Sequence, residues 1–194
     1  VRFVGNWPFG YSYAVAYDAL RDIGFCGSGG GVYILDLSNP SNPEKISENV
    51  HTRGIVWGLF YDPSDSLLYI TDRYAGLEIW DIKVPSTPAK LGFYDTPNHA
   101  WGVAVAGSYA YVADENAGLR VIDISTPSTP TEVGYCDTPG YAYGVAVAGS
   151  YAYVADYYAG LRVIDISTPS NPTEVGYCDT PGSARGVAVA GSYA

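Results

Sequence analysis

GVAVAGSYAYVADENAGLRVIDISTPSTPTEVGYCDTPG, residues 102–140, is the stretch that decides the fold, because it recurs almost unchanged at 144–182. A third copy opens with GVAVAGSYA at Gly186, so the period is 42 residues. More divergent copies lie upstream, with insertions such as DPSDS at 62–66 where the later copies have only Gly-Ser. A fixed period of about 20–50 residues indicates a repeat architecture in which each unit packs on its neighbours.

Each unit contains four runs typical of β-strands. The first, GVAVA, consists of small residues, and the second, YAYVA, alternates Ala with Tyr and Val. Between them, Gly107-Ser108 predicts a two-residue hairpin of type II′, which needs Gly at its first position. DENAG at 114–118 predicts a second hairpin, after which LRVID forms the third strand and TEVGYC the fourth. Pro127 and Pro130 end the third strand, because Pro cannot extend a central strand.

Four strands in every 42 residues match one blade of a β-propeller. The GVAVA run supports this interpretation, because the innermost strand of a blade lines a crowded axis where small residues fit. A helical solenoid is excluded by the period-2 pattern and the Gly and Pro punctuation. A parallel β-helix is the alternative, but its coil is shorter and needs no two hairpins per repeat. We therefore predict an all-β protein, a β-propeller of four-stranded antiparallel blades.

The same spacing assigns residues 1–194 to a single portion of a propeller. We expect the last strand of a preceding blade at 1–9, blades at 10–57, 58–101, 102–143 and 144–185, and the start of a further blade at 186–194. A propeller removes sheet edges by closing a ring of four to eight blades. Because both ends fall inside a blade, we expect an incomplete ring, a fragment that aggregates or oligomerises through unpaired edges when expressed alone. The alternative is a composite fifth blade that joins 186–194 to 1–9.

Four segments carry a shared signature, an apolar run that ends in Asp and is followed by a Ser/Pro loop. They are VYILDLSNPSNP (32–43), LEIWDIKVPSTP (77–88), LRVIDISTPSTP (119–130) and LRVIDISTPSNP (161–172). In this signature the chain resembles the LVIVD-repeat family over nearly its whole length. The resemblance implies a β-propeller from bacterial or archaeal proteins that are secreted or exposed at the cell surface. It carries no catalytic signature.

The composition limits the classes of partner that this protein is expected to bind. Lys and Arg number 10 against 20 Asp and Glu, which gives a net charge of −10. This balance argues against nucleic-acid binding, which needs a basic face. The longest uncharged run, 138–155, contains Pro and Gly and alternates as two short strands, so we expect no membrane insertion. Cys26, Cys136 and Cys178 are too few and too dispersed for a disulfide framework, and we interpret them as packing residues.

Two series of aspartates recur with the repeat. The series after the third strand comprises Asp36, Asp81, Asp123 and Asp165. It could form a ring of metal ligands, but repetition in every unit favours Asx turns in which each Asp accepts backbone N–H groups. The series between the second and third strands comprises Asp72, Asp114 and Asp156. It also fits a turn-stabilising function, but its loops vary in sequence (DRY, DEN, DYY), and variable loops on a fixed scaffold often bind ligands.

The residues that precede the first strand of each unit are a further candidate binding site. They are Tyr13, Trp57, Trp101, Tyr143 and Arg185. We expect them to ring one mouth of the axial channel, where aromatic rings suit a carbohydrate, a peptide or a partner protein. The alternative is that they wedge between blades as core. His99 lies in the same connection, but it and His51 lack the paired ligands of a metal site.

Two functions remain open at this point. The near-identity of the repeats favours a non-catalytic scaffold for binding a protein or a carbohydrate, because a uniform array leaves little room for a singular active site. The alternative is a propeller enzyme, such as a hydrolase, a lyase or a quinone-dependent dehydrogenase, with its site on the aromatic face. We predict no catalytic residues, no metal and no cofactor. Arg120 and Arg162 on the third strands are expected either to extend their charged ends to solvent or to pair with Glu132 and Glu174.

Overall fold

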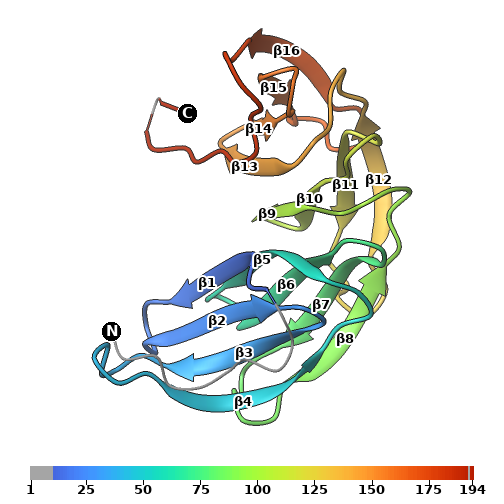
Figure 1. Cartoon of the computed structure of the whole chain (residues 1–194). Coiled ribbons are helices and arrows are strands. Elements are labelled where there is room, and N and C mark those ends of the chain that lie inside the picture. Colours follow the sequence, from blue (N-terminus) through green and yellow to red (C-terminus); the bar gives the residue numbers. More distant parts are fainter. Residues whose placement is uncertain (1–10, 192) are drawn as a thin grey trace.

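The computed structural model of the chain describes residues 11–191 and 193–194. All regular elements in this part are β-strands, arranged as four antiparallel four-stranded sheets. The sheets follow one another along an arc, each rotated relative to the last, and the arc does not close (Figure 1). The prediction of propeller blades in an incomplete ring is therefore confirmed.

The strands run in sequence order across each sheet. The first sheet holds β1 (Ala14–Asp18), β2 (Ile23–Ser28), β3 (Gly31–Asp36) and β4 (Glu44–His51). The second holds β5 (Val56–Asp62), β6 (Leu67–Asp72), β7 (Gly76–Asp81) and β8 (Ala89–Tyr94). The third holds β9 (Gly102–Ala106), β10 (Tyr109–Ala113), β11 (Leu119–Asp123) and β12 (Thr131–Cys136). The fourth holds β13 (Gly144–Ala148), β14 (Tyr151–Ala155), β15 (Leu161–Asp165) and β16 (Thr173–Cys178).

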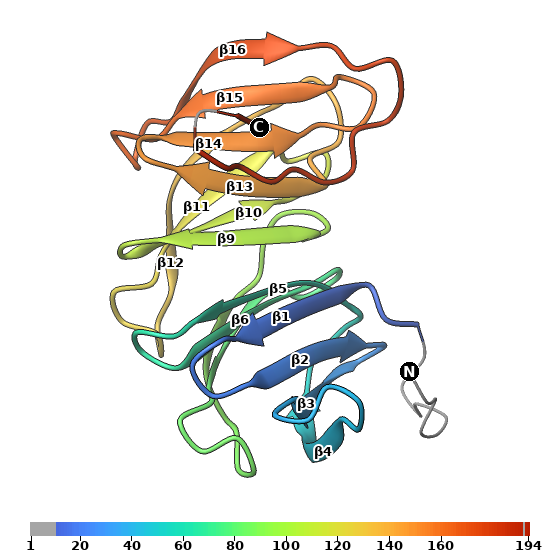
Figure 2. The ribbon, with the colours of Figure 1, turned by 90° about the vertical axis from the view of Figure 1, so that its left-hand side faces the viewer.

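The first strand of each sheet lines the inside of the arc. Strands β1, β5, β9 and β13 contact one another in that order (Figure 2). Glycine at the start of the strand permits this approach, because a Cβ on Gly102 would lie 2.9 Å from the Tyr143 carbonyl oxygen and 3.1 Å from Gly144 Cα. A Cβ on Gly58 would meet Trp101 and Gly102 in the same way. The small-residue run is therefore innermost, as predicted.

The turns follow the local chemistry of the sequence. Gly107 and Gly149 have φ of +58°, while Ser108 and Ser150 do not have positive φ, which is the type II′ pattern. The Asx turns after the third strands also form. In each, the Asp Oδ1 accepts the backbone N–H two residues later at 2.8 Å, and the four acceptors are Asp36, Asp81, Asp123 and Asp165. These aspartates therefore have a structural function, and their repetition reflects the fold.

The hydrophobic core lies between the blades. Each of three clusters joins one sheet to the next, for example Tyr111, Leu119 and Val121 of the third sheet with Val154 and Ile164 of the fourth. The faces of a single blade could not be buried without neighbours, so the blades stabilise one another as in other repeat proteins.

A second contact between blades lies over the fourth strand of a sheet. A glycine in this strand leaves a notch, and the Pro-Ser loop of the next blade fills it. A Cβ on Gly92 or Gly134 would clash with the Pro-Ser loop of the next blade, and for Gly134 it would lie 3.0 Å from Ser170 Cα. At the equivalent Gly176, only Val163 is within reach, at 4.0 Å. The cysteines differ in the same way: burial raises the pKa of the Cys136 thiol, while its equivalent Cys178 is exposed. The outer face of the fourth sheet is therefore open.

The predicted strand at 1–9 lies outside the described residues. Residues 186–189 form no strand, and Ala190 and Tyr193 form an isolated bridge. A Cβ on Gly144 would nevertheless lie 3.0 Å from the Arg185 carbonyl oxygen and from Gly186 Cα, the same close approach that Gly58 and Gly102 make to the next connection. All three cysteines are free.

The filled and open notches give a matched test of the contact between blades. Gly134→Val should destabilise the protein by about 2–3 kcal/mol, because the new side chain meets the backbone of the Pro169–Ser170 loop. Gly176→Val, the same change at the equivalent position of the fourth blade, should alter stability by less than about 0.5 kcal/mol. Urea unfolding of both variants measures the difference. Equal losses in the two variants would contradict the notch.

Candidate functional site

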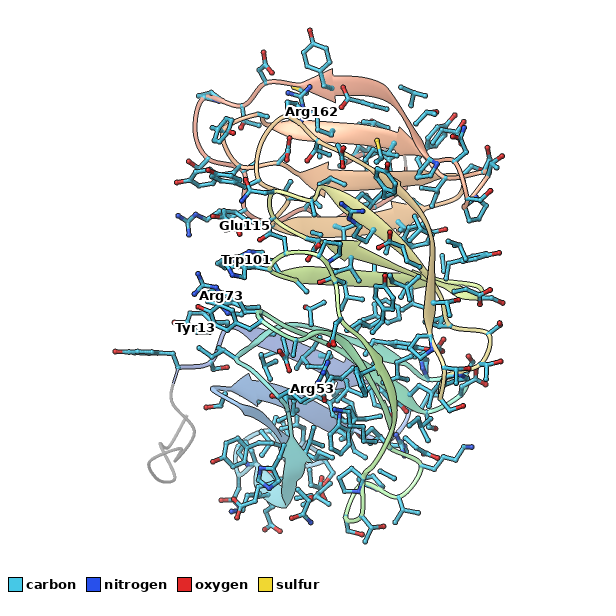
Figure 3. The ribbon with its side chains drawn as sticks, turned by 90° about the vertical axis from the view of Figure 1, so that its right-hand side faces the viewer. Tyr13, Arg53, Arg73, Trp101, Glu115 and Arg162 are labelled. Carbon is cyan, nitrogen blue, oxygen red and sulfur yellow. The ribbon has the colours of Figure 1, made fainter. Side chains whose placement is uncertain are left out.

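An aromatic row crosses one mouth of the arc. Each member lies just before an inner strand or at its start, and the members are Tyr13, Trp57, Trp101 and Tyr143. The rings of Tyr13 and Trp57 stack with their centroids 3.9 Å apart. The ring centroids of Trp57 and Trp101 are 4.2 Å apart, and those of Trp101 and Tyr143 are 4.4 Å apart. Figure 3 shows Tyr13 and Trp101 along one edge of the molecule. Four of the predicted site residues are therefore brought together by the rotation between blades. The row belongs partly to the core and partly to the surface, since Tyr13 is 49% exposed.

Arg73, which the sequence analysis did not single out, lies over this row. Its Cζ is 5.3 Å from the Trp101 ring centroid, 6.0 Å from that of Trp57 and 5.0 Å from that of Tyr74. Its backbone is held on both sides, because its N–H donates to Ile55 O at 3.1 Å and its carbonyl accepts from Ala100 N at 3.2 Å. The signal in the sequence was its place directly after Asp72, in the variable turn.

The equivalent turn positions in the next two blades hold Glu115 and Tyr157. Both have positive φ, +47° and +46°, in a region that most residues avoid. Each forms an isolated bridge with the next connection, at Ala142 and Ala184, which holds the backbone there. The three blades therefore present three different side chains, cationic, anionic and aromatic, at one position of the mouth.

His99 and Arg185, two further residues predicted to lie at the mouth, each contact neighbouring side chains there. His99 Nδ1 lies 2.7 Å from Glu115 Oε2, and its ring packs edge-on against Tyr74 with centroids 4.9 Å apart. The Arg185 Cζ lies 5.8 Å from the Tyr143 ring centroid and 5.4 Å from that of Tyr157. Hydrogen bonds from Ser183 and Arg185 lower the pKa of the Tyr157 hydroxyl.

Asp72, Asp114 and Asp156 lie behind the mouth and are fully buried. Each holds the connection that enters its blade. Asp114 accepts the Thr96 hydroxyl at 2.6 Å and the Asn98 N–H at 3.0 Å, and Asp156 accepts the Thr138 hydroxyl at 2.6 Å and the Gly140 N–H at 2.8 Å. Asp72 accepts the Gly54 N–H at 2.8 Å and also the Ala75 N–H of its own turn at 3.0 Å. Their oxygens are thus committed to the fold, and they position the mouth by anchoring its connections.

Burial raises the pKa of all three carboxyls, and it raises that of Asp114 to about 6. The hydrogen bonds from Thr96 and Asn98 oppose this shift without cancelling it. Removing a carboxylate from water disfavours its charged form, which explains the direction.

Charge pairs between the third and fourth strands recur at the same repeat positions, but the acidic and basic residues exchange places in one blade. Arg120 pairs with Glu132 at 3.4 Å and Arg162 with Glu174 at 3.3 Å, which confirms the predicted pairs. In the second blade the order is reversed, because the fully buried Glu78 accepts Lys90 Nζ at 2.7 Å.

The family model for the LVIVD repeat matches residues 25–52, 64–96, 97–138 and 139–180. These four matches cover most of the chain and coincide with the repeats that build the four sheets. The chain belongs to the LVIVD-repeat family.

This LVIVD-repeat protein has a similar fold to a solved structure, that of the computationally designed Ika8 protein, with a TM-score of 0.71 and 11% sequence identity. The match covers 93% of this chain and 53% of the designed chain, so this protein spans about half the length of the structure it resembles. At this identity the likeness concerns the fold alone. No curated protein matches the chain in sequence.

The opposite end of the LVIVD-repeat blades has a pocket of about 390 Å³ between the second and third sheets. Asp62, Asp65 and Asp81 line it, and Lys83 lies 4.0 Å from Asp81. Among the described residues, no three His, Cys, Asp or Glu side chains form a group that could hold a metal ion. The same residues include no apolar helix of membrane-spanning length.

Chemically, the mouth of the LVIVD-repeat protein offers flat apolar rings, N–H donors and one histidine–carboxylate pair. Its buried aspartates have both oxygens engaged. The arrangement therefore suits recognition of a ligand that contacts rings and accepts hydrogen bonds.

The buried carboxyl of Asp114 should make stability depend on pH. Because the folded protein holds this proton more tightly than the unfolded chain, protonation contributes stability that is fully present below the unfolded pKa of 3.8 and is lost as the pH rises through about 6. The stability of the unmodified protein relative to Asp114→Asn should therefore fall by about 1–2 kcal/mol between pH 5 and pH 7.5.

Urea unfolding across this pH range measures the difference, and Asp123→Asn is the control. Hydrogen bonds from Ser125 lower the pKa of the exposed Asp123, so its contribution has the opposite sign and is lost only as the pH falls through the lowered pKa. A constant difference between the unmodified protein and Asp114→Asn across this range would show that Asp114 does not titrate there.

Proposed function

We propose that this chain is a non-catalytic propeller scaffold that binds a protein or carbohydrate ligand at the mouth lined by the aromatic row, as part of a secreted or cell-surface protein. The continuous contact from Tyr13 through Trp57 and Trp101 to Tyr143 carries the proposal. Trp, Tyr and Arg side chains near the centre of an interface supply most of the binding energy in many complexes. The extracellular location rests on the family resemblance.

The variable turns support recognition at the same end. Arg73, Glu115 and Tyr157 occupy one repeat position on an otherwise uniform scaffold, and two of them hold strained backbone. Variation confined to loops on a rigid frame is typical of binding surfaces. The buried aspartates behind them keep the connections fixed, so the rings are preorganised before a ligand arrives.

A propeller enzyme is the second candidate function, favoured by the pair of His99 and Glu115. A histidine oriented by a carboxylate at 2.7 Å is the arrangement of a general base. Hydrolase, lyase and dehydrogenase chemistry can each use such a pair as the base that removes a proton. His99→Ala tests the enzyme function, because it should abolish turnover of a substrate that the unmodified protein converts.

Truncating the row tests the binding function. Trp57→Ala and Trp101→Ala should each weaken a ligand found on glycan and protein arrays by at least about tenfold, the loss expected when a central aromatic anchor is removed. Tyr151→Ala is the control, because Tyr151 is 41% exposed at the opposite end of the inner hairpin. Unchanged binding by both tryptophan variants, or turnover of a substrate by the intact protein, would refute the scaffold.

A further inference from the structure

The cations of this acidic protein are paired with carboxylates, except at the mouth. Among residues 11–191, seven Lys and Arg side chains lie within 4.0 Å of an Asp or Glu oxygen: Arg21, Lys45, Arg53, Lys83, Lys90, Arg120 and Arg162. In the same range Arg73 and Arg185 form no such pair. Both lie over rings of the aromatic row or its neighbours. In a chain of net charge −10, two unneutralised guanidinium groups at one end form a local site for anions.

We propose that the mouth binds an anionic saccharide, with acidic groups on Arg73 and Arg185 and with sugar rings packed against the exposed tyrosines beside the row. This inference rests on the proposed function and names the ligand class of the same site. The two cations lie at different places along the row. Arg73 lies over Trp57 and Trp101, and Arg185 lies beyond Tyr143. A ligand that uses both therefore carries more than one acidic group along its length, as an acidic oligosaccharide does.

The geometry of Arg73 suits an acidic group. A guanidinium presents a planar fork that matches a carboxylate or a sulfate with two parallel hydrogen bonds. The rings of Trp57, Tyr74 and Trp101 hold this fork in place and partly desolvate it. An ion pair formed there is less screened than one on the open surface.

The exposed rings beside the row favour a saccharide over an acidic peptide. Tyr74 is 64% exposed and Tyr158 is 62% exposed, and flat rings of this kind can pack against the apolar faces of sugars. The Arg73 Cζ lies 5.0 Å from the Tyr74 ring centroid, so a sugar ring and its acidic group can be bound side by side there.

Calorimetric titration with matched probes tests the inference. The probes are trigalacturonate, its fully methyl-esterified form with the same rings and no charge, a sulfated trisaccharide and a short poly-glutamate peptide. The proteins are the unmodified chain, Arg73→Ala, Arg185→Ala and, as a control, Lys83→Ala, whose lysine lies at the other end of the blades. Tryptophan fluorescence follows the same titrations, because Trp57 and Trp101 are in the site.

We expect at least one acidic saccharide to bind at least about tenfold more tightly than the methyl ester, with that preference lost in Arg73→Ala, reduced in Arg185→Ala and kept in Lys83→Ala. Preference for trigalacturonate or for the sulfated probe distinguishes carboxylate from sulfate as the acidic group. Equal binding of the acid and its ester would overturn the inference while leaving the proposed function in place. Binding of poly-glutamate but of no saccharide, or an acid preference that survives both arginine changes, would also overturn it. If no probe binds, the inference fails, and the array experiment decides the proposed function separately.

Discussion

The close approach of four inner strands around one axis is the constraint on which the rest of this structure depends. Gly58 and Gly102 lie near the start of their inner strands, and because they have no side chain, the connection into the next blade can lie against their backbone. Because the inner strands are this close, the outer strands must fan apart, and larger side chains fill the space between sheets. The same closeness brings the residue before each inner strand against its neighbour. The aromatic row is therefore a direct consequence of the packing at the axis.

The buried aspartates connect this packing to the mouth. Asp114 and Asp156 hold the incoming connection by a threonine hydroxyl and a backbone N–H, and burial makes their charged form unfavourable. Their carboxyls join these connections to the sheets through hydrogen bonds. The protein thus uses an electrostatically costly group to position a surface, and the repeat places that group behind the mouth in three successive blades.

Diversity at the mouth is confined to few positions. Most of the 42-residue unit is constrained by the axis, the hairpins and the contact of one blade with the next. The residue after each buried aspartate differs in all three blades, as Arg73, Glu115 and Tyr157, while the residue before or at the start of each inner strand is aromatic in the four described blades. Recognition can therefore change without altering the scaffold.

The sequence by itself determined the repeat unit, the order of strands, the inner position of GVAVA, the turn types and the Asx turns, because each depends on contacts within one unit. It also pointed to the aromatic positions, since they share one place in the repeat. Only the tertiary structure decided that Arg73 lies over Trp57 and Trp101, that Asp114 is buried, and that Glu78 and Lys90 reverse the pairing of Arg120 and Glu132. The stacking and the burial depend on how one blade is rotated against the next, and that rotation is decided by contacts between side chains of different repeats, which the sequence of one repeat does not specify.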